Sequence, residues 1–250
     1  MKVTAIKTKV IQPGEDLFKF LHEHISILEE RSIVVITSKI LSFAQNRFAP
    51  AIEKTREEKH DLVRRETDLY LDPSKSKYDI MITIKNSLLA VNAGIDESNS
   101  PGQYILWPEN LQEFTNQIWQ FLRETYKVKD LGVIITDSKT MPLRWGVTGT
   151  AVSYCGFNPL IDKRGLTDIF GREMKMTQIQ IAEAIAIAAV FEMGESNEQR
   201  PLAIVNDFQQ AIEFQDRVPD EEEIKALSID PEDDVYAPLL LSVPWKKGGK

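Results

Sequence analysis

Apolar side chains recur every three or four residues in three segments of the chain, which is the spacing of an amphipathic helix. The first two segments are residues 14–30 and residues 109–126. Their stripes consist of Leu17, Phe20, Leu21, Ile25 and Leu28 in the first, and of Leu111, Phe114, Ile118, Phe121 and Leu122 in the second. We therefore predict a helix in each segment, and the first should begin in its acidic residues 15 and 16.

The third segment, residues 177–194, is apolar around most of its circumference and is the longest helix candidate. A helix of that character packs in the centre of a molecule or at a subunit interface. Thr177 is suited to the N-cap, because its hydroxyl accepts a hydrogen bond from a free backbone N–H. Gly194 is suited to the C-terminal stop.

Runs of β-branched and apolar residues predict strands in four places. Residues 32–41 predict a buried strand that continues into a polar turn, and residues 78–91 predict one or two strands. Residues 132–138 and residues 201–205 predict one short strand each, whereas the charged residues 51–69 predict a solvated helix. Because strands and helices do not alternate in a regular βαβ rhythm, we predict the α+β class with irregular mixed sheets; an irregular α/β arrangement is the alternative.

The composition changes along the chain and suggests its organisation. Residues 1–213 are long enough for one large domain or two interleaved subdomains. Within them, residues 139–172 are rich in Gly, Pro and polar side chains, which predicts short strands and long ordered loops of the kind that often carry function. Residues 214–250 contain acids, prolines and then an apolar patch, so we predict an arm that packs on the body or on a partner chain.

The overall composition narrows the class of protein. No apolar run reaches the roughly 18 residues needed to cross a bilayer, and the N-terminus lacks the features of a signal peptide. A single cysteine, Cys155, fits a reducing compartment. The net charge of −8 disfavours a duplex nucleic-acid binder but not a nucleotide binder, because metal ions bridge acidic side chains to phosphates. We predict a cytoplasmic protein with no nucleic-acid or membrane partner.

Covalent catalysis has little support in the sequence. The three histidines, His22, His24 and His60, lie in predicted helices on charged or mixed faces, and Cys155 belongs to no motif. The chain contains no G-x-S-x-G, H-E-x-x-H or Walker A motif, and no G-x-G-x-x-G follows a strand. These residues are therefore interpreted as structural, and the chemistry must be carried by other side chains.

Acidic residues follow two of the apolar runs. Asp96 lies in NAGIDESN and Asp137 lies in IITDSK. A carboxylate at the end of a buried strand is held rigidly and can face a cleft, and two or three of them bind Mg²⁺ or Mn²⁺ while leaving room for phosphate oxygens. The alternative is that each acid caps a turn. Ser38 and Lys39, which follow another strand, are suited to hold a phosphate.

Several separated motifs occur in an order typical of one known family. They are ITSKILS, NAGIDESNSPG, GVIITDS, GFNPLIDKRGLTDIFGREMKMTQ, and MGE followed by PLAIV. Over roughly residues 5–207 the chain resembles the γ-glutamyl ligase family, typified by the enzyme that adds glutamate to the deazaflavin precursor of coenzyme F420. The resemblance implies an intertwined α+β homodimer that uses GTP or ATP, two divalent cations (Mg²⁺ or Mn²⁺), L-glutamate and an acceptor; it also admits a monovalent cation.

The resemblance implies a role for individual residues as well. Asp96 and Asp137 resemble ligands of one metal and catalytic residues, and Ser138 and Glu195 resemble ligands of the second metal. Arg144, with Arg164 and Arg172, is a candidate for binding substrate carboxylates, since Arg binds them bidentately. The residues that resemble nucleotide contacts are Lys9, Val10, Ile11, Gln12, Ser38, Lys39, Asn99, Met193, Gly194, Glu195, Ser196, Asn197, Glu198, Gln199 and Arg200.

Two departures from the deazaflavin enzymes bear on the acceptor. Phe43 and Met141 stand where those enzymes usually carry a lysine and an arginine, whereas Arg144 keeps a later arginine. The resemblance is therefore stronger to a branch associated with folate metabolism, and we predict a folate-type acceptor. The deazaflavin precursor is the first alternative, and a non-catalytic dimeric scaffold that binds nucleotide and metal is the second. In either enzyme, transfer of the nucleotide γ-phosphate to the acceptor carboxylate would give an acyl phosphate, which the glutamate amine then attacks.

Overall fold

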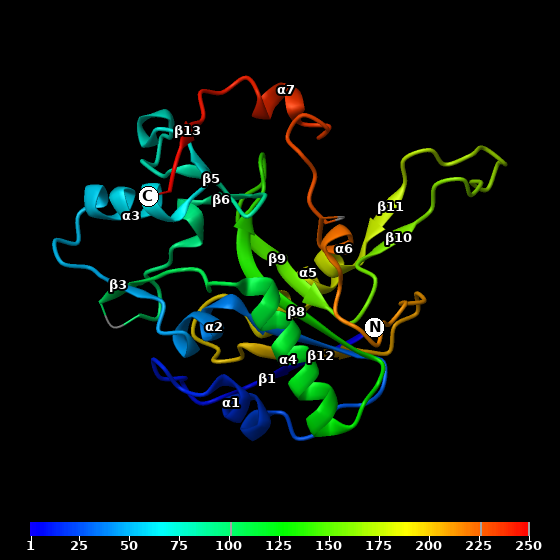
Figure 1. Cartoon of the computed structure of the whole chain (residues 1–250). Coiled ribbons are helices and arrows are strands. Elements are labelled where there is room, and N and C mark those ends of the chain that lie inside the picture. The colour runs from blue at the N-terminus through cyan, green and yellow to red at the C-terminus, as the bar shows by residue number, and fades with distance from the viewer. Residues whose placement is uncertain (101, 226, 250) are drawn as a thin grey trace.

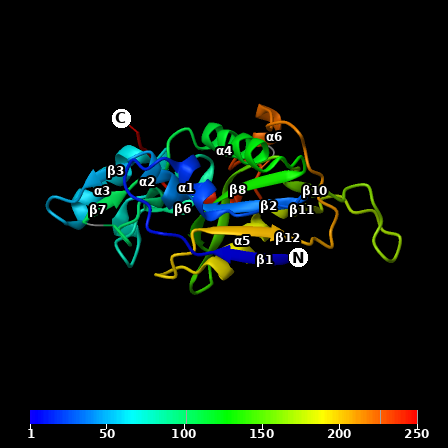
Figure 2. The same cartoon turned by 90° about the horizontal axis from the view of Figure 1, so that it is seen from below.

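A five-stranded mixed sheet forms the centre of the computed structural model, which describes residues 1–100, 102–225 and 227–249 (Figure 1). In spatial order its strands are β1 (Lys2–Ile6), β12 (Leu202–Asn206), β2 (Ser32–Thr37), β8 (Leu131–Thr140) and β9 (Val147–Cys155). Figure 2 shows β8, β2, β12 and β1 side by side. Only the β2–β8 pair within this sheet is parallel. The predicted α+β class is confirmed.

Alternating side chains of the sheet pack in two separate apolar cores, as the two-residue period of a strand requires. Val34, Ile36 and Ile135 face a core shared with α1 (Leu17–His24), α2 (Ser38–Ala44) and α4 (Leu111–Tyr126). Ile33 and Ile134 face the opposite core, which is covered by α5 (Ile181–Met193). Helices therefore cover both faces, and the sheet between them is rigidly held.

A smaller part of the chain, at the upper left of Figure 1, carries a second sheet. Its strand order is β13 (Lys246–Lys247), β4 (Leu69–Tyr70), β5 (Ile82–Lys85) and β6 (Leu88–Val91). Helix α3 (Arg56–Glu66), the 3-10 turns at Pro73–Lys75 and Asn92–Gly94, and the pair β3 (Phe48–Pro50) and β7 (Gln103–Ile105) complete this part. A third apolar cluster, which includes Val63, Met81 and Tyr104, packs its interior.

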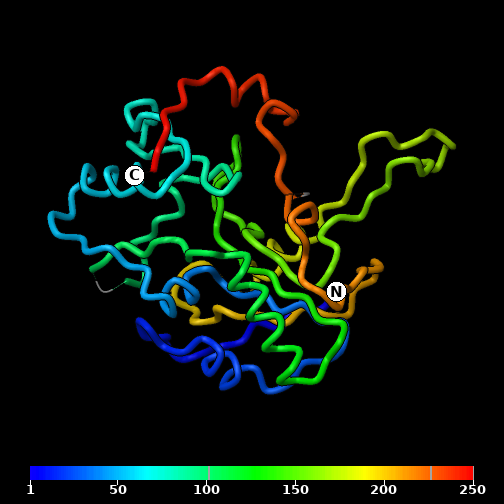
Figure 3. Tube along the Cα trace, viewed as in Figure 1, coloured from blue at the N-terminus to red at the C-terminus, as the bar shows by residue number. Residues whose placement is uncertain are grey.

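An extended hairpin leaves the body between β10 (Leu160–Asp162) and β11 (Gln178–Gln180), as the Cα trace in Figure 3 shows. Its exposed apolar side chains include Ile169, Phe170 and Met176. The prediction of long loops and short strands in residues 139–172 is confirmed by this hairpin and by β10, which has three residues, but β9 in the same segment is longer, with nine residues. Strand β9 is long because it pairs with β8 along most of its length.

Two of the three predicted helices differ from their expected bounds. The helix predicted at residues 14–30 is α1 alone, capped by the Asp16 carboxylate, which accepts from two backbone N–H groups. It ends because Ile25 is extended, and Leu28 is buried outside the helix. The helix predicted at 109–126 is confirmed as α4.

The segment 177–194 was predicted as one helix and is a strand followed by a helix. Residues Gln178–Gln180 pair with β10 as β11, so Thr177 is not the N-cap and Gln180 takes that position. Helix α4, with 16 residues, is longer than α5, with 13. Gly194 is confirmed as the C-terminal stop of α5. One face of α5 is buried against the central sheet, whereas Phe191 on its other face is 82% exposed.

The predicted strands are confirmed at 78–91 as β5 and β6, at 132–138 as β8 and at 201–205 as β12. The segment 32–41 is a strand only to Thr37, because residues from Ser38 onward form α2 instead of a polar turn. The charged segment 51–69 contains α3, which starts at Arg56 behind the N-cap Thr55.

The predicted C-terminal arm packs on the body of the same chain. It carries α6 (Glu221–Lys225), α7 (Ala237–Leu240) and β13, which pairs with β4. Ala226 and Lys250 of this arm, and Pro101 of the loop NAGIDESNSPG, lie outside the described residues. The boundary between residues 213 and 214 stays a prediction. Among the described helices, none has the length and apolar character needed to span a bilayer.

Candidate active site

The parallel pairing of β2 and β8 brings two of the predicted polar segments together. Thr37 stands opposite Thr136 at the end of the pair. Because the strands run in the same direction, Ser38–Lys39 and Asp137–Ser138 follow at the same edge of the sheet. In a sheet with parallel strands, the carboxyl ends of the strands are the usual place for a ligand crevice.

The segment that precedes β12 reaches the same edge, because β12 runs antiparallel to β2. The Thr37 N–H donates to Pro201 O at 3.0 Å, and the Thr8 N–H donates to Gln199 O at 3.0 Å. The loop that carries Asp96 arrives from the smaller sheet, and Asn99 Nδ2 donates to Ser196 O at 3.0 Å. Five stretches of chain that are distant in sequence therefore meet at one place.

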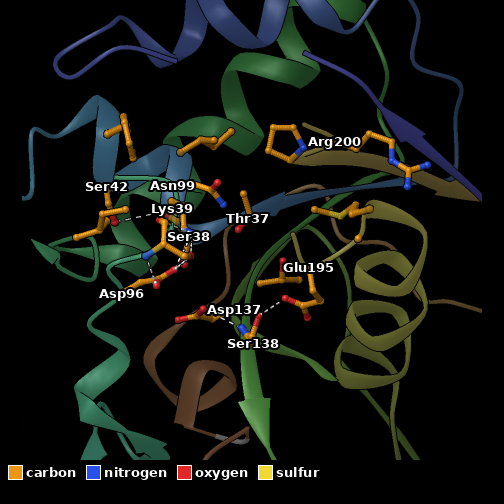
Figure 4. Close-up of a pocket in the computed structure, with 18 of the residues that line it drawn as sticks. Thr37, Ser38, Lys39, Ser42, Asp96, Asn99, Asp137, Ser138, Glu195 and Arg200 are labelled. Atoms are coloured by element: carbon orange, nitrogen blue, oxygen red, sulfur yellow. Dashed lines mark hydrogen bonds and ion pairs between the residues drawn. The ribbon is translucent and has the colours of Figure 1, made fainter. Parts of the chain in front are cut away.

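These stretches surround a cavity of about 580 Å³, which is within the range of about 300–1,000 Å³ typical of small-molecule sites (Figure 4). Nearly all of the predicted site residues line it: Lys9, Val10, Ile11, Ser38, Lys39, Asp96, Asn99, Asp137, Ser138, Met193, Gly194, Glu195, Ser196, Asn197, Glu198, Gln199 and Arg200. The predicted site residues that do not are Gln12, Arg144, Arg164 and Arg172. The structure thus brings together residues that the sequence could only place at separate positions.

Asp96 is paired with a lysine at the edge of the cavity. Its Oδ2 lies 2.6 Å from Lys39 Nζ, and Ser98 donates to the carboxylate from its backbone N–H and its hydroxyl, both at 2.8 Å. Burial works to raise the pKa of Asp96, but the Lys39 ammonium and the two Ser98 donors outweigh it and hold the pKa below its usual value. Asp96 is therefore a carboxylate anion that is paired with the Lys39 ammonium.

Asp137 has a different environment, although it lines the same cavity. Its Oδ1 accepts from the Ser138 N–H at 2.8 Å, and its Oδ2 accepts from the indole N–H of Trp107. Burial raises the pKa of Asp137 to about 6, against the effect of these two donors, and the nearby Asp96 charge acts in the same direction as burial. No cationic side chain among the described residues forms an ion pair with Asp137.

The second predicted pair of metal ligands is also in contact, because the Ser138 hydroxyl donates to Glu195 Oε2 at 2.6 Å (Figure 4). Two carboxylates on one side and a hydroxyl with a carboxylate on the other are oxygen donors, which suit Mg²⁺ or Mn²⁺. Within the described residues, no three His, Cys, Asp or Glu side chains are gathered as one ready-made metal site. The donor chemistry fits divalent cations, and the two predicted metal sites stay a prediction.

The predicted carboxylate-binding arginines do not gather at the cavity. Arg144 lies in the turn between β8 and β9, where its side chain is exposed and donates to the adjacent Leu143 O. Arg164 forms an ion pair with Asp162 at the base of the extended hairpin, and Arg172 is exposed within that hairpin. Gln12 is exposed beside α1. The roles of these residues stay predictions.

Trp107 is a site residue that the sequence reasoning missed. It is 4% exposed, it lines the cavity, and it contacts a predicted catalytic carboxylate. No motif or periodicity in YILWPEN indicates that its tryptophan donates a hydrogen bond in a functional site. The acceptor, Asp137, lies 30 residues later in the sequence. Glu97, which follows Asp96 directly in the chain, forms an ion pair with Lys59 at 2.6 Å outside the cavity.

The histidines and the cysteine lie outside the cavity lining. His24 Nδ1 is 2.8 Å from Phe20 O, and His60 Nε2 is 3.1 Å from Asp79 O, so each ring is bonded to the main chain. Cys155 is fully buried, and burial raises the pKa of its thiol to about 12. A thiol with such a pKa is protonated at neutral pH and is not a nucleophile.

The pKa of Asp137 leads to a pH dependence that can be measured. In the metal-free protein we expect its carboxyl carbon to titrate near pH 6 by NMR, while that of Asp96 titrates below the ordinary value of 3.8. Because the folded-state pKa of Asp137 is raised, the folded protein binds the proton more tightly than the unfolded chain between about pH 4 and pH 6. Its contribution to the free energy of unfolding is therefore present at low pH and is lost as the pH rises through about 6.

Addition of Mg²⁺ should lower the apparent pKa of Asp137, because the cation competes with the proton for the same oxygens. A titration of Asp137 near pH 4 in the metal-free protein would contradict the expected effect of burial. An Asp137 titration that Mg²⁺ leaves unchanged would contradict a cation at this carboxylate.

Comparison with known proteins gives one consistent family. The family described as F420-0:Gamma-glutamyl ligase matches residues 5–207. A coenzyme F420:L-glutamate ligase of Methanopyrus kandleri is 33% identical over 207 residues, which cover 78% of this chain and 81% of the relative. Proteins of the same name from Methanococcus maripaludis and Haloarcula marismortui are 32% and 31% identical, over 82% and 96% of this chain and 87% and 97% of the relatives.

Proposed function

The chain belongs to the F420-0:gamma-glutamyl ligase family, whose members form γ-glutamyl bonds, and from this premise we propose that it joins L-glutamate to the deazaflavin precursor of coenzyme F420. The observation that carries the proposal is the cavity that collects Asp96, Asp137, Ser138 and Glu195 in a chain of this family. Covalent catalysis through a thiolate has no support, because the only cysteine is buried and its thiol is protonated.

The deazaflavin acceptor is better supported than the folate-type acceptor that the sequence favoured. The relatives compared above are all named for coenzyme F420. Of the two departures from the deazaflavin enzymes, Phe43 lines the cavity, but it is 7% exposed and its ring packs edge-on against Phe48 at 4.8 Å, so it also has a structural role. The other, Met141, is 50% exposed and does not line the cavity. Met141 therefore has no bearing on the acceptor at this cavity, and the packing of Phe43 on Phe48 accounts for its ring without a pterin.

The proposed reaction makes an amide without a protein nucleophile. The γ-phosphoryl group of GTP or ATP passes to the acceptor carboxylate, and the amine of L-glutamate then displaces phosphate from the acyl phosphate. Lys39 provides positive charge for the phosphates at the edge where Asp96 lies. The apolar side chains of Ile11, Leu106 and Met193 line the same cavity and limit the access of water, which would hydrolyse an acyl phosphate.

Asp96, Asp137, Ser138 and Glu195 are the residues that would hold the two divalent cations. Bound cations would neutralise the phosphate charges and the charge that develops during transfer. The segment from Met193 to Arg200 and the amide of Asn99 would position the nucleotide, since Asn99 Nδ2 is already bonded to Ser196 O.

A homodimer is part of the proposal. Large apolar side chains are exposed on the turn between β8 and β9, on the extended hairpin and on α5: Trp145 is 95% exposed, Phe170 83% and Phe191 82%. We propose that a second copy of the chain covers these three side chains, since an interface removes exposed apolar surface from water. A second copy of the chain that covers these side chains would also surround Arg144, which lies beside Trp145 in the sequence.

A product assay tests the proposal. Purified protein is incubated with L-glutamate, GTP or ATP, Mg²⁺ or Mn²⁺, and either the deazaflavin precursor or a reduced folate. We expect the mass of one glutamyl residue to be added to the deazaflavin acceptor, with release of phosphate and dependence on the nucleotide and the cation. The same preparation should sediment with the mass of two chains.

Other outcomes of the assay identify the alternatives. Glutamyl addition to the folate alone would replace the deazaflavin acceptor by the folate-type acceptor. Tight nucleotide binding without any product from either acceptor would indicate the non-catalytic scaffold.

A further inference from the structure

Trp107 fixes the orientation of the Asp137 carboxylate. The indole N–H donates to Asp137 Oδ2, while the Ser138 N–H donates to Oδ1 at 2.8 Å. With one donor on each oxygen, the carboxylate cannot rotate about its Cβ–Cγ bond without losing both bonds. Each oxygen keeps one lone pair for another partner, since a carboxylate has about four acceptor positions.

Two neighbours contact the indole, and a third holds the main chain of Trp107. Gly94 lies against its edge with a φ of +70°, and a Cβ at this position would be 2.1 Å from Trp107 Nε1. Lys85 Nζ lies 5.8 Å from the ring centroid and is bonded to Glu66 at 3.3 Å. Arg47 Nε donates to Trp107 O at 3.1 Å. Trp107 therefore has no freedom to follow a carboxylate that moves.

The segment that ends in Trp107 also holds the other acid. The Asp96 N–H donates to Ile105 O at 3.0 Å, and the Ile105 N–H donates to Asp96 O at 2.8 Å. Ile105 is paired with Asp96 through the main chain, and Trp107, two residues later, is paired with Asp137 through its side chain. This stretch of chain thus sets where the two carboxylates stand relative to each other.

We propose that Trp107 is a positioning residue, which together with Ile105 holds Asp137 and Asp96 at the spacing that a shared divalent cation requires. The inference rests on the proposed function, because it assumes that these two carboxylates bind the cation. Hydrogen-bond partners of metal ligands commonly change affinity by about 10- to 100-fold when they are removed. Gly94 has the supporting role of leaving space for the indole.

A second tryptophan provides a matched control. Trp119 is also 4% exposed, its indole N–H donates to Leu131 O at 2.7 Å, and Arg123 lies over its ring at 4.5 Å. Gly156 lies against it with a φ of +84°, and a Cβ there would be 2.0 Å from Trp119 Nε1. Trp119 does not line the cavity. Trp119→Phe removes an indole hydrogen bond and Gly156→Ala places a Cβ against an indole, as the Trp107 and Gly94 variants do, but both lie away from the proposed cation.

The experiment is a titration of the full chain with Mn²⁺ alone, followed by the paramagnetic resonance signal of free Mn²⁺. Trp107→Phe and Gly94→Ala should each raise the Kd for Mn²⁺ by about 10- to 100-fold, whereas Trp119→Phe and Gly156→Ala leave it unchanged. In the ligation assay, the Mn²⁺ concentration for half-maximal rate should rise with Trp107→Phe, and the KM for L-glutamate should not.

The wild-type protein supplies a second measurement that does not depend on a variant that folds. The indole N–H resonance of Trp107 should shift when Mg²⁺ binds, and that of Trp119 should stay in place. Equal Mn²⁺ affinities for Trp107→Phe and wild type, or an unresponsive Trp107 resonance in a protein that binds Mg²⁺, would overturn the positioning role of Trp107. The proposed metal site would stand. A wild-type protein that binds no Mn²⁺ would overturn the proposed metal site and this inference together.

Discussion

Replacing Asp96 by asparagine should lower the rate of glutamyl transfer by about a thousandfold, which corresponds to about 4 kcal/mol of barrier. Asparagine is nearly isosteric but carries no charge, so it loses the attraction of Asp96 both for a cation and for Lys39, whose Nζ is 2.6 Å away. The measurement is the initial rate of product formation at saturating nucleotide, together with the Kd for Mn²⁺.

The neighbouring acid provides the control for this prediction. Glu97→Gln removes the same charge from the same loop, but Glu97 is paired with Lys59 outside the cavity, and its side chain is 58% exposed. Since exposed ion pairs contribute little, we expect its rate and Mn²⁺ affinity to stay within about twofold of wild type. Equal losses in the two variants would show that the loop needs negative charge in general, and Asp96 would not be a metal ligand.

The second large effect is expected on stability, at Ile25. Its side chain is 1% exposed in the core between α1, α4 and the central sheet, so Ile25→Ala should lower the free energy of unfolding by about 2–5 kcal/mol. For a domain of this size, each kcal/mol corresponds to about 2–4 °C in Tm. Urea denaturation followed by circular dichroism measures the change.

Ile27 is the matched control, because it is the same residue type two positions later and is 67% exposed. Ile27→Ala should change the free energy of unfolding by no more than about 0.5 kcal/mol. A loss at Ile27 as large as that at Ile25 would mean that a further surface, such as a partner chain, covers this segment. Dependence of the loss on protein concentration would identify that case.

Local pattern predicted the elements whose two faces differ in polarity. The spacing of Leu111, Ile118 and Leu122 placed α4 to within two residues, because a helix buries every third or fourth side chain. The same reasoning predicted that the first helix continues to residue 30. The helix ends before Ile25, whose backbone is in the extended conformation although its side chain belongs to the buried stripe. Burial alone therefore does not separate a helix from the buried chain that follows it.

The residues 178–180 show a different limit of sequence reasoning. They fit the apolar pattern of the helix that follows, but they pair with Leu160–Asp162 as a strand. A strand partner is supplied by another part of the chain, and no local pattern contains it. Ser38 and Lys39 illustrate the same point, because the turn predicted for them is the first turn of α2.

The sequence by itself determined the family, the α+β class and the polar side chains able to bind a cation and phosphates, among them Asp96 and Asp137. These properties reside in residue identity and in spacings of a few residues, which the chain carries whatever its partners are. Only the tertiary structure decided that the loop of Asp96 meets the end of β8, that Trp107 holds Asp137 and that Arg144 stands apart from the cavity. Each of these depends on the register of β2 with β8 and on packing between distant segments. Such contacts form only when the whole chain folds, so no local stretch of sequence contains them.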